Sequence, residues 1–397
     1  MTNFNLVIAH AKLYPFYMPS HLYVHVPFCD GKCHYCGFYS VMAEPRLTAL
    51  YHGLPACELT QALTAHPRIA RDAIQTVYMG GGTPALLGAD GLKRLTDSLS
   101  AVLPLDAVEE WTVELNPASV APGLLAALHD LGVNRLSIGV QSFNDDTLAR
   151  VGRRHNAQTA LRAIRLAQDA GFENTGIDLI AGLPGVTPEE WQETLERSVS
   201  LGLVHLSVYA LSLEPGTVLS RQAAAGLVIP DDEAQLAALA QAESVLNQAG
   251  FARYEISNYA LPGFECLHNL GVWHGNDFIG LGPAAASRVG RMRWTNEEDL
   301  ADYIEALAEN REPPRTCETL DETDDAMERA VFALRLHEGI DPFEVAARFS
   351  ALAGRAELWE ERLERLARQG IAERGGRRWR LTSRGREVCD AAIRELF

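Results

Sequence analysis

The chain has 397 residues, 47% of them hydrophobic, which is enough to bury one large core and a smaller second one. Its formal net charge of −17 argues against broad binding to nucleic acids or to anionic membranes. Seven cysteines in so long a chain do not suggest a disulfide framework, and no segment reaches the ~18 consecutive apolar residues of a membrane span.

The first 210 residues alternate between short apolar runs and helical segments. Runs rich in Val, Ile and Tyr begin near residues 22, 74, 110, 135, 176 and 205. Segments with helical periodicity lie at 46–64, 90–103, 121–131, 156–170 and 187–201. Asp90 and Thr187 are candidate N-caps, and Glu190 completes a capping box with Thr187. Six such units predict a parallel sheet with right-handed crossovers, and a further helix is expected at 232–249.

The residues before the first apolar run carry none of these patterns. Met18 stands five residues before Tyr23. We therefore expect an N-terminal extension over residues 1–20, whose first 17 residues are disordered or reflect a start-codon choice in which Met18 is the true start.

Three cysteines follow the first apolar run directly. Cys29, Cys33 and Cys36 have C-x3-C-x2-C spacing. Three thiolates can hold three irons of a [4Fe-4S] cluster and leave the fourth iron open to a small ligand. The spacing resembles the radical-SAM signature, in which S-adenosylmethionine (SAM) binds that iron through its amino and carboxylate groups. The alternatives are three unrelated buried thiols or a zinc site with His34 as a further ligand, although zinc sites favour paired C-x2-C elements.

Polar and glycine-rich motifs stand where the other predicted strands end. They are found at residues 80–84, 114–117, 139–143, 178–185 and 212–216. Because active sites of barrel-like α/β folds form at the carboxyl ends of the strands, we expect these motifs to converge on one mouth. Glycines allow backbone to approach a ligand closely, carboxylates suit an amine or ribose hydroxyls, and an arginine can pair with a carboxylate. Each motif alone could instead be a tight turn or a surface cap.

Together these motifs resemble the oxygen-independent coproporphyrinogen oxidase family of radical-SAM proteins. The matching elements are Tyr-Val-His-Val-Pro-Phe-Cys (23–29), Gly-Gly-Gly-Thr-Pro (80–84), Leu-Ser-Ile-Gly-Val-Gln-Ser-Phe (136–143), Gly-Arg-Arg-His (152–155) and Ile-Asp-Leu-Ile-Ala-Gly-Leu-Pro (177–184). The resemblance implies an α/β fold with a partial (β/α)6 barrel. It also implies a SAM pocket at Tyr23, Tyr35, Gly81, Gly82, Thr83, Glu114, Gln141, Arg153 and Asp178.

Two details distinguish the branches of this family. The oxidases have a fourth cysteine two residues after the motif, where this chain has Phe38. The segment around His268 resembles the His-Asn-x-x-Tyr-Trp element of the heme-chaperone branch, with Val272 in place of the tyrosine. The resemblance therefore implies heme contacts for His268, Asn269 and Trp273.

Heme iron accepts His or thiolate ligands, so His268 and Cys266 are the candidate axial ligands. Alternatively, His268 only forms a hydrogen bond within a loop and Cys266 is a buried core residue.

The last part of the chain predicts a small helical domain that resembles a winged helix. Helices are expected at 324–336, 342–349 and 358–369, followed by a hairpin at 371–381 and a last helix, capped by Thr382 or Ser383, that ends at residue 396. Residues 311–315 are the expected linker. The domain is only mildly basic, which disfavours nucleic acid as a partner and favours a lid or partner-docking role.

We therefore expect an extension (1–20), a radical-SAM partial barrel (21–220), a barrel-completing region with the heme motif (221–310) and a C-terminal winged-helix-like domain (311–397). The expected protein binds one [4Fe-4S] cluster, SAM and heme, and passes heme to an acceptor protein. A flavodoxin or ferredoxin would supply electrons, and the oxygen-labile cluster indicates the reducing cytoplasm. The alternatives are an anaerobic coproporphyrinogen III oxidase, a radical methyltransferase that uses SAM twice, and a structural or nucleic-acid-binding protein.

Overall fold

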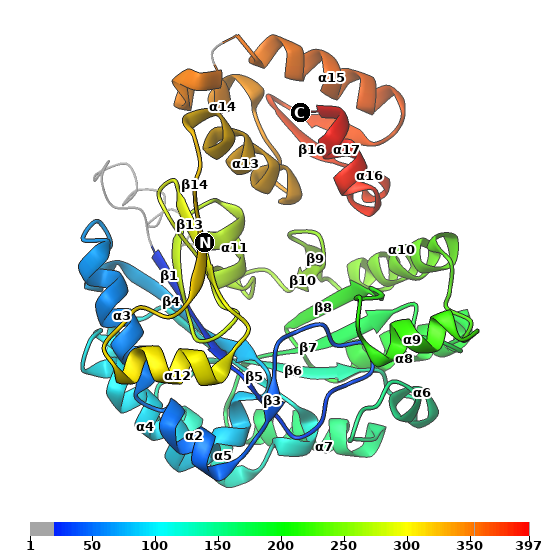
Figure 1. Cartoon of the computed structure of the whole chain (residues 1–397). Helices are drawn as coiled ribbons and strands as arrows, with labels where there is room; N and C mark the ends of the chain where they lie inside the picture. The colour runs from blue at the N-terminus through cyan, green and yellow to red at the C-terminus, as the bar shows by residue number, and fades with distance from the viewer. Residues whose placement is uncertain (1–19, 353, 397) are drawn as a thin grey trace.

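The chain folds into a barrel-like sheet surrounded by helices, with a second group of helices on its open side (Figure 1). A computed structural model describes residues 20–352 and 354–396. The expected disordered segment and the question of Met18 as the start lie outside the described residues.

One twelve-stranded sheet forms the framework, in the linear order β14-β13-β12-β11-β1-β4-β5-β6-β7-β8-β10-β9. Its central strands are parallel, as predicted for the six units: β11 (Asp277–Leu281), β1 (Ser20–Val26), β4 (Ile74–Gly81), β5 (Glu110–Leu115), β6 (Arg135–Gln141), β7 (Asn174–Ala181) and β8 (His205–Ala210). Antiparallel strands extend both ends: β12 (Ala286–Val289), β13 (Met292–Asn296), β14 (Arg315–Thr319), β10 (Asn258–Ala260) and β9 (Ala252–Arg253). These added strands, with β11, were not predicted.

Helices cover the outer face of this sheet (Figure 1). They are α2 (Pro45–Tyr51), α3 (Leu54–Ala65), α4 (Gly88–Ser100), α5 (Pro122–Asp130), α6 (Asp145–Arg150), α7 (Ala157–Asp169), α8 (Pro188–Ser200), α10 (Asp232–Gln248) and α12 (Leu300–Ala308). Helix α9 (Val218–Ala224) instead packs beside the cysteine loop, where the N–H of Leu219 donates to the carbonyl of His34. Short 3-10 turns are η1 (Arg71–Ala73), η2 (Pro84–Leu87), η3 (Leu105–Ala107), η4 (Pro117–Ser119) and η5 (Ser350–Leu352). Among the described residues, no helix has the length and apolar character needed to span a membrane.

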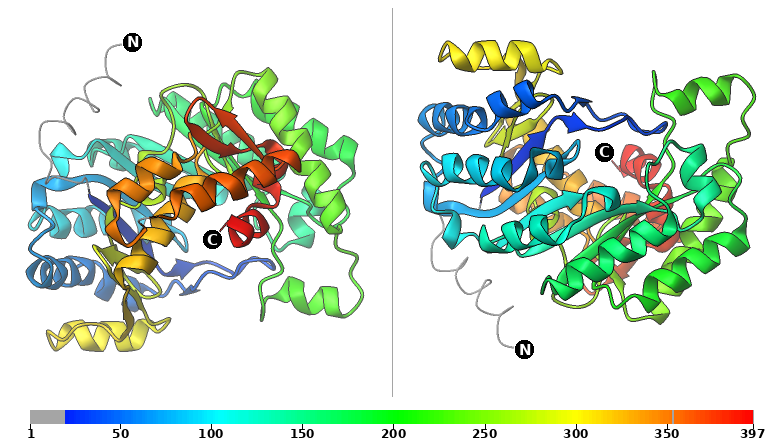
Figure 2. Two further views of the ribbon diagram at one scale, coloured as in Figure 1. Left: turned by 90° about the horizontal axis from the view of Figure 1, so that it is seen from above. Right: turned by 90° about the horizontal axis from the view of Figure 1, so that it is seen from below.

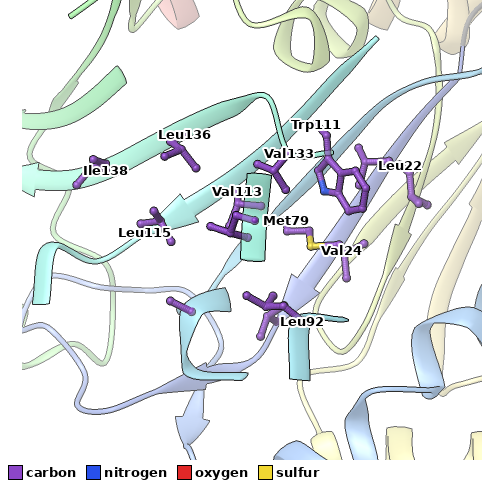
Figure 3. Close-up of a cluster of buried hydrophobic side chains, with 14 of the residues drawn as sticks. Leu22, Val24, Met79, Leu92, Trp111, Val113, Leu115, Val133, Leu136 and Ile138 are labelled. Atoms are coloured by element: carbon purple, nitrogen blue, oxygen red, sulfur yellow. The ribbon is translucent and has the colours of Figure 1, made fainter. Parts of the chain in front are cut away.

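The main hydrophobic core lies between the sheet and these outer helices. Side chains in a strand alternate between the two faces of a sheet. In β5, Trp111, Val113 and Leu115 are buried in this core, where Leu92 of α4 also lies (Figure 3). The intervening residues Glu110, Thr112 and Glu114 take the opposite face, toward the barrel interior. The same alternation in neighbouring strands supplies the interior with polar groups.

Local signals decided where several helices begin. The predicted capping box of α8 is present, with Thr187 accepting from the backbone N–H of Glu190 and the Glu190 carboxylate accepting from that of Thr187. The prediction of Asp90 as an N-cap is wrong, because η2 leads directly into α4 and places Asp90 in its first turn. The single helix expected over 46–64 is two helices, since Gly53 separates them and Pro55 cannot donate the backbone hydrogen bond of a continuous helix.

A smaller second core holds the C-terminal unit together. Its elements are α13 (Glu322–Arg335), α14 (Pro342–Arg348), α15 (Ala356–Arg368), β15 (Ala372–Gly375), β16 (Arg378–Leu381), α16 (Ser383–Glu387) and α17 (Cys389–Leu396). The predicted hairpin is the β15–β16 pair, and Thr382 caps the helix that follows. The expected last helix is interrupted at Val388, which separates α16 from α17. Strand β14 pairs with β13, so the chain leaves the large sheet only just before α13.

The C-terminal unit lies over the open side of the barrel, opposite the outer helices (Figures 1 and 2). Buried ion pairs join the two parts. Arg386 of α16 and Arg253 share the carboxylate of Glu243 on α10, at 2.6 and 2.8 Å. Arg288 of β12 pairs with Asp325 and Glu328 of α13. Because breaking a buried ion pair leaves an uncompensated charge, these pairs hold the unit against the barrel.

Candidate functional site

The three-cysteine loop is closed at its base by a short strand pair. Strands β2 (Phe28–Cys29) and β3 (Val41–Met42) run parallel, with Cys29 opposite Met42. The loop is also held to the end of α6, because the backbone N–H of His34 donates to Val151 and His34 Nδ1 lies 2.9 Å from the carbonyl of Arg150. This contact occupies one imidazole nitrogen with backbone, which weakens the alternative in which His34 completes a zinc site.

A cavity of about 660 Å³ opens beside this loop, at the carboxyl ends of the central strands. The three thiols line it together with eight of the nine predicted SAM positions: Tyr35, Gly81, Gly82, Thr83, Glu114, Gln141, Arg153 and Asp178. The motifs of separate strands therefore converge, as expected. Tyr23 is the exception, because its side chain lines a neighbouring cavity and its hydroxyl lies 3.1 Å from His25 Nδ1.

The glycine run makes one wall of this cavity. Gly81 has a φ of 98°, which favours glycine. Gly82 donates to the carbonyl of Val26 at 2.9 Å, and an added Cβ at Gly82 would lie 2.5 Å from the carbonyl oxygen of Phe28. The next residue, Thr83, donates its N–H to that same carbonyl at 2.7 Å. The run is therefore pressed against the strand that leads into the cysteine loop, and only glycine fits at Gly82.

Two buried carboxyl groups, Glu114 of β5 and Asp178 of β7, line the same face of the sheet in this cavity, with strand β6 between them. Glu114 accepts from the Tyr78 hydroxyl at 2.8 Å and from the Gly81 N–H at 3.2 Å. Burial and the nearby Asp178 raise the pKa of Glu114 to about 7. Burial also raises the pKa of Asp178, although hydrogen bonds such as the one from Ser137, 3.1 Å away, oppose this. The pair therefore offers hydrogen-bond acceptors for amino or hydroxyl groups, and the ionisation of Glu114 changes near neutral pH.

A buried cation stands between these acids and the cysteines. Arg153 donates to the carbonyl of Gly139, and its Nη1 lies 3.4 Å from Cys33 Sγ. The structure shows no partner for its buried Nε among the described residues. Gln141 follows a register shift in β6 and has a φ of 65°, a strained conformation for a residue other than glycine. Such strain is concentrated at functional sites, and here it falls on a residue that lines the cavity.

A second cavity, of about 880 Å³, lies between the barrel interior and the C-terminal unit. It is lined by Tyr23 and by all three residues of the predicted heme motif, His268, Asn269 and Trp273. The opposite wall includes Arg335, Arg386, Cys389 and Arg394 of the C-terminal unit. Tyr78 and Tyr209 line both cavities and mark where they meet.

The motif residues stand on a short helix, α11 (Leu267–Trp273), that is held at both ends. At its start, Glu110 accepts from the backbone N–H groups of Leu267 and His268 at 2.9 and 3.0 Å, a favourable place for a carboxylate. At its end, the Trp273 ring packs edge-on against Phe332 and under the Arg335 guanidinium, 5.2 Å from the ring centre. The motif helix is thus fixed by the barrel on one side and by α13 on the other.

Cys266 does not take the place expected of an axial ligand. It is fully buried outside both cavities, and its Sγ lies 3.4 Å from Glu110 Oε1. Burial raises the pKa of this thiol to about 12, so it is neutral at pH 7. The structure therefore matches the alternative in which Cys266 is a core residue.

Comparison with known proteins places this arrangement in a family. Residues 23–197 match the Radical SAM superfamily. The heme chaperone HemW of Mycobacterium tuberculosis is 35% identical over 385 residues, which cover 96% of this chain and 95% of that protein. HemW of Escherichia coli K12 is 34% identical, over 96% of this chain and 98% of that protein. The chain belongs to the HemW family.

The predicted family and fold are confirmed. The solved structure of coproporphyrinogen III oxidase (HemN) from Escherichia coli has a TM-score of 0.81 and 24% identity, and covers 99% of this chain and 93% of that one. This shows that the HemW-family chain has the radical-SAM fold. The exposed Phe38 at the rim of the smaller cavity stands where the oxidases were expected to have a fourth cysteine.

The cofactors of the superfamily are a [4Fe-4S] cluster and SAM, and this HemW-family site fits both. Across residues 20–352 and 354–396, no three His, Cys, Asp or Glu side chains are grouped to share a single metal ion. A cubane instead needs one thiolate for each of three irons, which Cys29, Cys33 and Cys36 can supply from one loop. The glycine run leaves space for a ligand of the open iron, and the two carboxyl groups provide hydrogen-bond acceptors for it.

Some residues that line the two cavities were not predicted from the sequence. Tyr78 precedes Gly80 by two residues, so strand alternation alone places it on the inner face and could have identified it. Tyr209 stands two residues after Ser207 in β8, so the same alternation places both side chains on one face of the sheet. Arg335 and Arg394 stand on helices far along the chain, and no local signal in the sequence brings them to the barrel.

The raised pKa of Glu114 predicts a pH dependence for SAM binding. An ionised carboxylate accepts stronger hydrogen bonds, and with a pKa of about 7 the ionised fraction rises roughly tenfold between pH 6 and pH 8. We expect SAM affinity, measured by equilibrium dialysis with the cluster present, to rise by up to about tenfold over this range. Glu114→Gln should lose that part of the dependence. An identical pH profile in both proteins would show that Glu114 does not contribute.

Proposed function

We propose that this chain binds heme in the larger cavity and passes it to an acceptor protein. The observation that carries the proposal is that His268, Asn269 and Trp273 share one wall of a cavity of about 880 Å³, within the usual size range of ligand pockets. The relatives at 33–35% identity are named heme chaperones. Heme enters as cargo, with the cluster and SAM as resident cofactors in the smaller cavity.

The chemistry of the larger cavity suits a metallated porphyrin. His268 Nδ1 is held by the Thr76 hydroxyl at 2.8 Å, and Nε2 has no hydrogen-bond partner among the described residues, which leaves it for the iron. Trp273 and the cavity tyrosines provide aromatic surface for the ring. Arg394 is exposed and has no ion-pair partner in the described part of the chain, so it is suited to a heme propionate.

The C-terminal unit then acts as the outer wall of the heme site. Arg335 lies over the Trp273 ring and pairs with Asp390 of α17. Movement of the C-terminal unit would therefore also move the groups that contact the motif helix. We infer that the acceptor protein docks here and that heme leaves when this wall opens. A flavodoxin or ferredoxin is the proposed reductant of the cluster, and the seven free cysteines are consistent with a reducing cytoplasm.

The proposal is tested by titrating the cluster-loaded protein with ferric heme and following the Soret band. We expect about one heme per chain, as a single axial histidine implies. His268→Ala should weaken binding by at least about tenfold or shift the Soret band, because the axial ligand is lost, while iron and sulfide content stay the same. His129→Ala is the matched control, since His129 lies exposed on α5 far from the cavity. Equal heme binding by wild type and His268→Ala would contradict the proposed site.

A second arm separates the chaperone from the oxidase. The protein is incubated anaerobically with coproporphyrinogen III, SAM and a reductant. We expect neither protoporphyrinogen nor carbon dioxide. Formation of both, with release of deoxyadenosine, would replace the chaperone proposal by the oxidase.

A further inference from the structure

Behind the proposed heme ligand runs a buried chain of hydrogen bonds. His268 Nδ1 lies 2.8 Å from Thr76 Oγ1, and the same oxygen lies 2.9 Å from His21 Nδ1. His21 Nε2 in turn lies 3.2 Å from the side-chain amide nitrogen Nδ2 of Asn276. All four side chains are buried, and they come from α11, β4, β1 and the turn before β11. Ordinary core packing does not require two histidines to share one hydroxyl.

A glycine in α11 leaves the space that these hydrogen-bonded side chains occupy, although it destabilises the helix. Gly271 lies in the middle of α11, although glycine destabilises a helix interior by roughly 1 kcal/mol relative to alanine. A Cβ at this position would lie 2.0 Å from His21 Nε2, and the buried imidazole is held in place by its hydrogen bonds. The glycine therefore allows α11 to approach His21 closely enough for His268 to reach Thr76.

We propose that Thr76 and His21 form a relay that fixes the ring orientation and the tautomer of His268 for heme. This inference rests on the proposed function. Iron binds an imidazole nitrogen that carries no proton, so His268 must carry its proton on Nδ1 when Nε2 is the ligand. Nδ1–H then donates to Thr76 Oγ1 and the Thr76 hydroxyl donates to His21 Nδ1. His21 Nε2–H donates to the Asn276 carbonyl oxygen once the Asn276 amide has turned from the orientation in the structure, in which Nδ2 faces His21 Nε2.

The relay can also run in the opposite direction. If the Asn276 amide N–H donates to His21 Nε2, then His21 Nδ1–H donates to Thr76, the Thr76 hydroxyl donates to His268 Nδ1, and Nε2 of His268 carries a proton. The two directions differ in the tautomer of both histidines and in the orientation of the Thr76 hydroxyl and the Asn276 amide, and each histidine carries one proton in either direction. Heme therefore selects one direction, and the protein neither gains nor loses a proton. Thr76 and His21 are positioning residues, since they act through His268.

The test compares Thr76→Val with Thr76→Ser in the full-length, cluster-loaded protein. Valine keeps the shape but removes the acceptor, so His268 Nδ1–H loses its partner and the ligand becomes less basic. We expect the Fe–His stretching frequency of the ferrous heme complex, measured by resonance Raman, to fall in Thr76→Val. Heme affinity should fall about tenfold or more, as for other partners of metal-bound histidines. Thr76→Ser should restore both values toward those of the wild type.

His21→Leu provides a second, independent variant. It leaves Thr76 as an acceptor for His268 but removes the group that polarises the hydroxyl, so the frequency should shift in the same direction by a smaller amount. If Thr76→Val does not fold, this variant decides the question. Wild-type frequency and affinity in Thr76→Val, or in His21→Leu where the first does not fold, would overturn the relay.

The outcomes for the relay and for the proposed function can be told apart. If His268→Ala binds heme as the wild type does, the proposed heme ligand is wrong, and there is no heme-bound histidine for the relay to position. If His268→Ala loses heme while Thr76→Val retains the wild-type spectrum, the heme site stands and only the relay is wrong.

Discussion

Replacing any one of Cys29, Cys33 and Cys36 by alanine is expected to remove the [4Fe-4S] cluster. A cubane held by only three protein thiolates has no spare ligand, so each substitution leaves one iron without its cysteine ligand. The variants should lose the visible absorbance of the cluster and most of their iron and sulfide after anaerobic reconstitution. SAM binding should fall with it, because the open iron is the anchor of that ligand.

The controls are Cys57→Ala and Cys317→Ala. Both thiols are exposed, Cys57 on α3 and Cys317 on β14, and neither lines the cofactor cavity. Their iron content should equal that of the wild type. A Cys33→Ala protein with unchanged iron and sulfide content would show that the cluster is held elsewhere.

The residues around the cofactor cavity could be predicted because strand ends carry a positional rule. Each polar motif follows an apolar run, and parallel strands end at one edge of the sheet. That rule placed Gly82, Glu114 and Asp178 in one cavity from three separate strands. The rule says nothing of Tyr23, which lies within β1 rather than at its end and lines the neighbouring cavity; only the family resemblance implies a place for it in the SAM pocket.

The second cavity could be predicted only in part. The motif on α11 was recognisable, but the partners of that helix come from elements far away in sequence. Strand β11 joins the sheet beside β1, more than 250 residues earlier. Whether a cysteine next to the motif faces a cavity or the core depends on such packing, which is why Cys266 could not be excluded as a ligand beforehand. For the same reason, the sequence did not predict that Arg335 and Arg394 of the C-terminal unit line this cavity.

Glu110 connects these two parts of the molecule, and its removal should lower the stability of the fold. The carboxylate accepts from the backbone N–H groups of Leu267 and His268, and from Cys266. Its neighbour Arg135 is 1% exposed. Burial lowers the pKa of Arg135, but attraction to the acidic groups around it, Glu110 among them, outweighs burial and raises the pKa above its ordinary value. Glu110 thus caps the motif helix and places negative charge near a buried cation, although the described structure shows no direct ion pair between the two side chains.

We expect Glu110→Ala to lower the free energy of unfolding by roughly 2–4 kcal/mol, because buried hydrogen-bond donors are left unsatisfied and negative charge near Arg135 is lost. Two of these donors are backbone N–H groups at the start of α11, so α11 should loosen and heme affinity should fall even in the protein that remains folded. Urea unfolding of the cluster-free protein measures the first effect, and heme titration at low temperature the second. The matched control is Glu109→Ala, the exposed neighbour, whose hydrogen bond to Gln75 lies at the surface and whose loss should cost no more than about 1 kcal/mol. Equal stability of the two variants would mean that Arg135 finds its compensation elsewhere, and that the barrel does not hold the heme motif through Glu110.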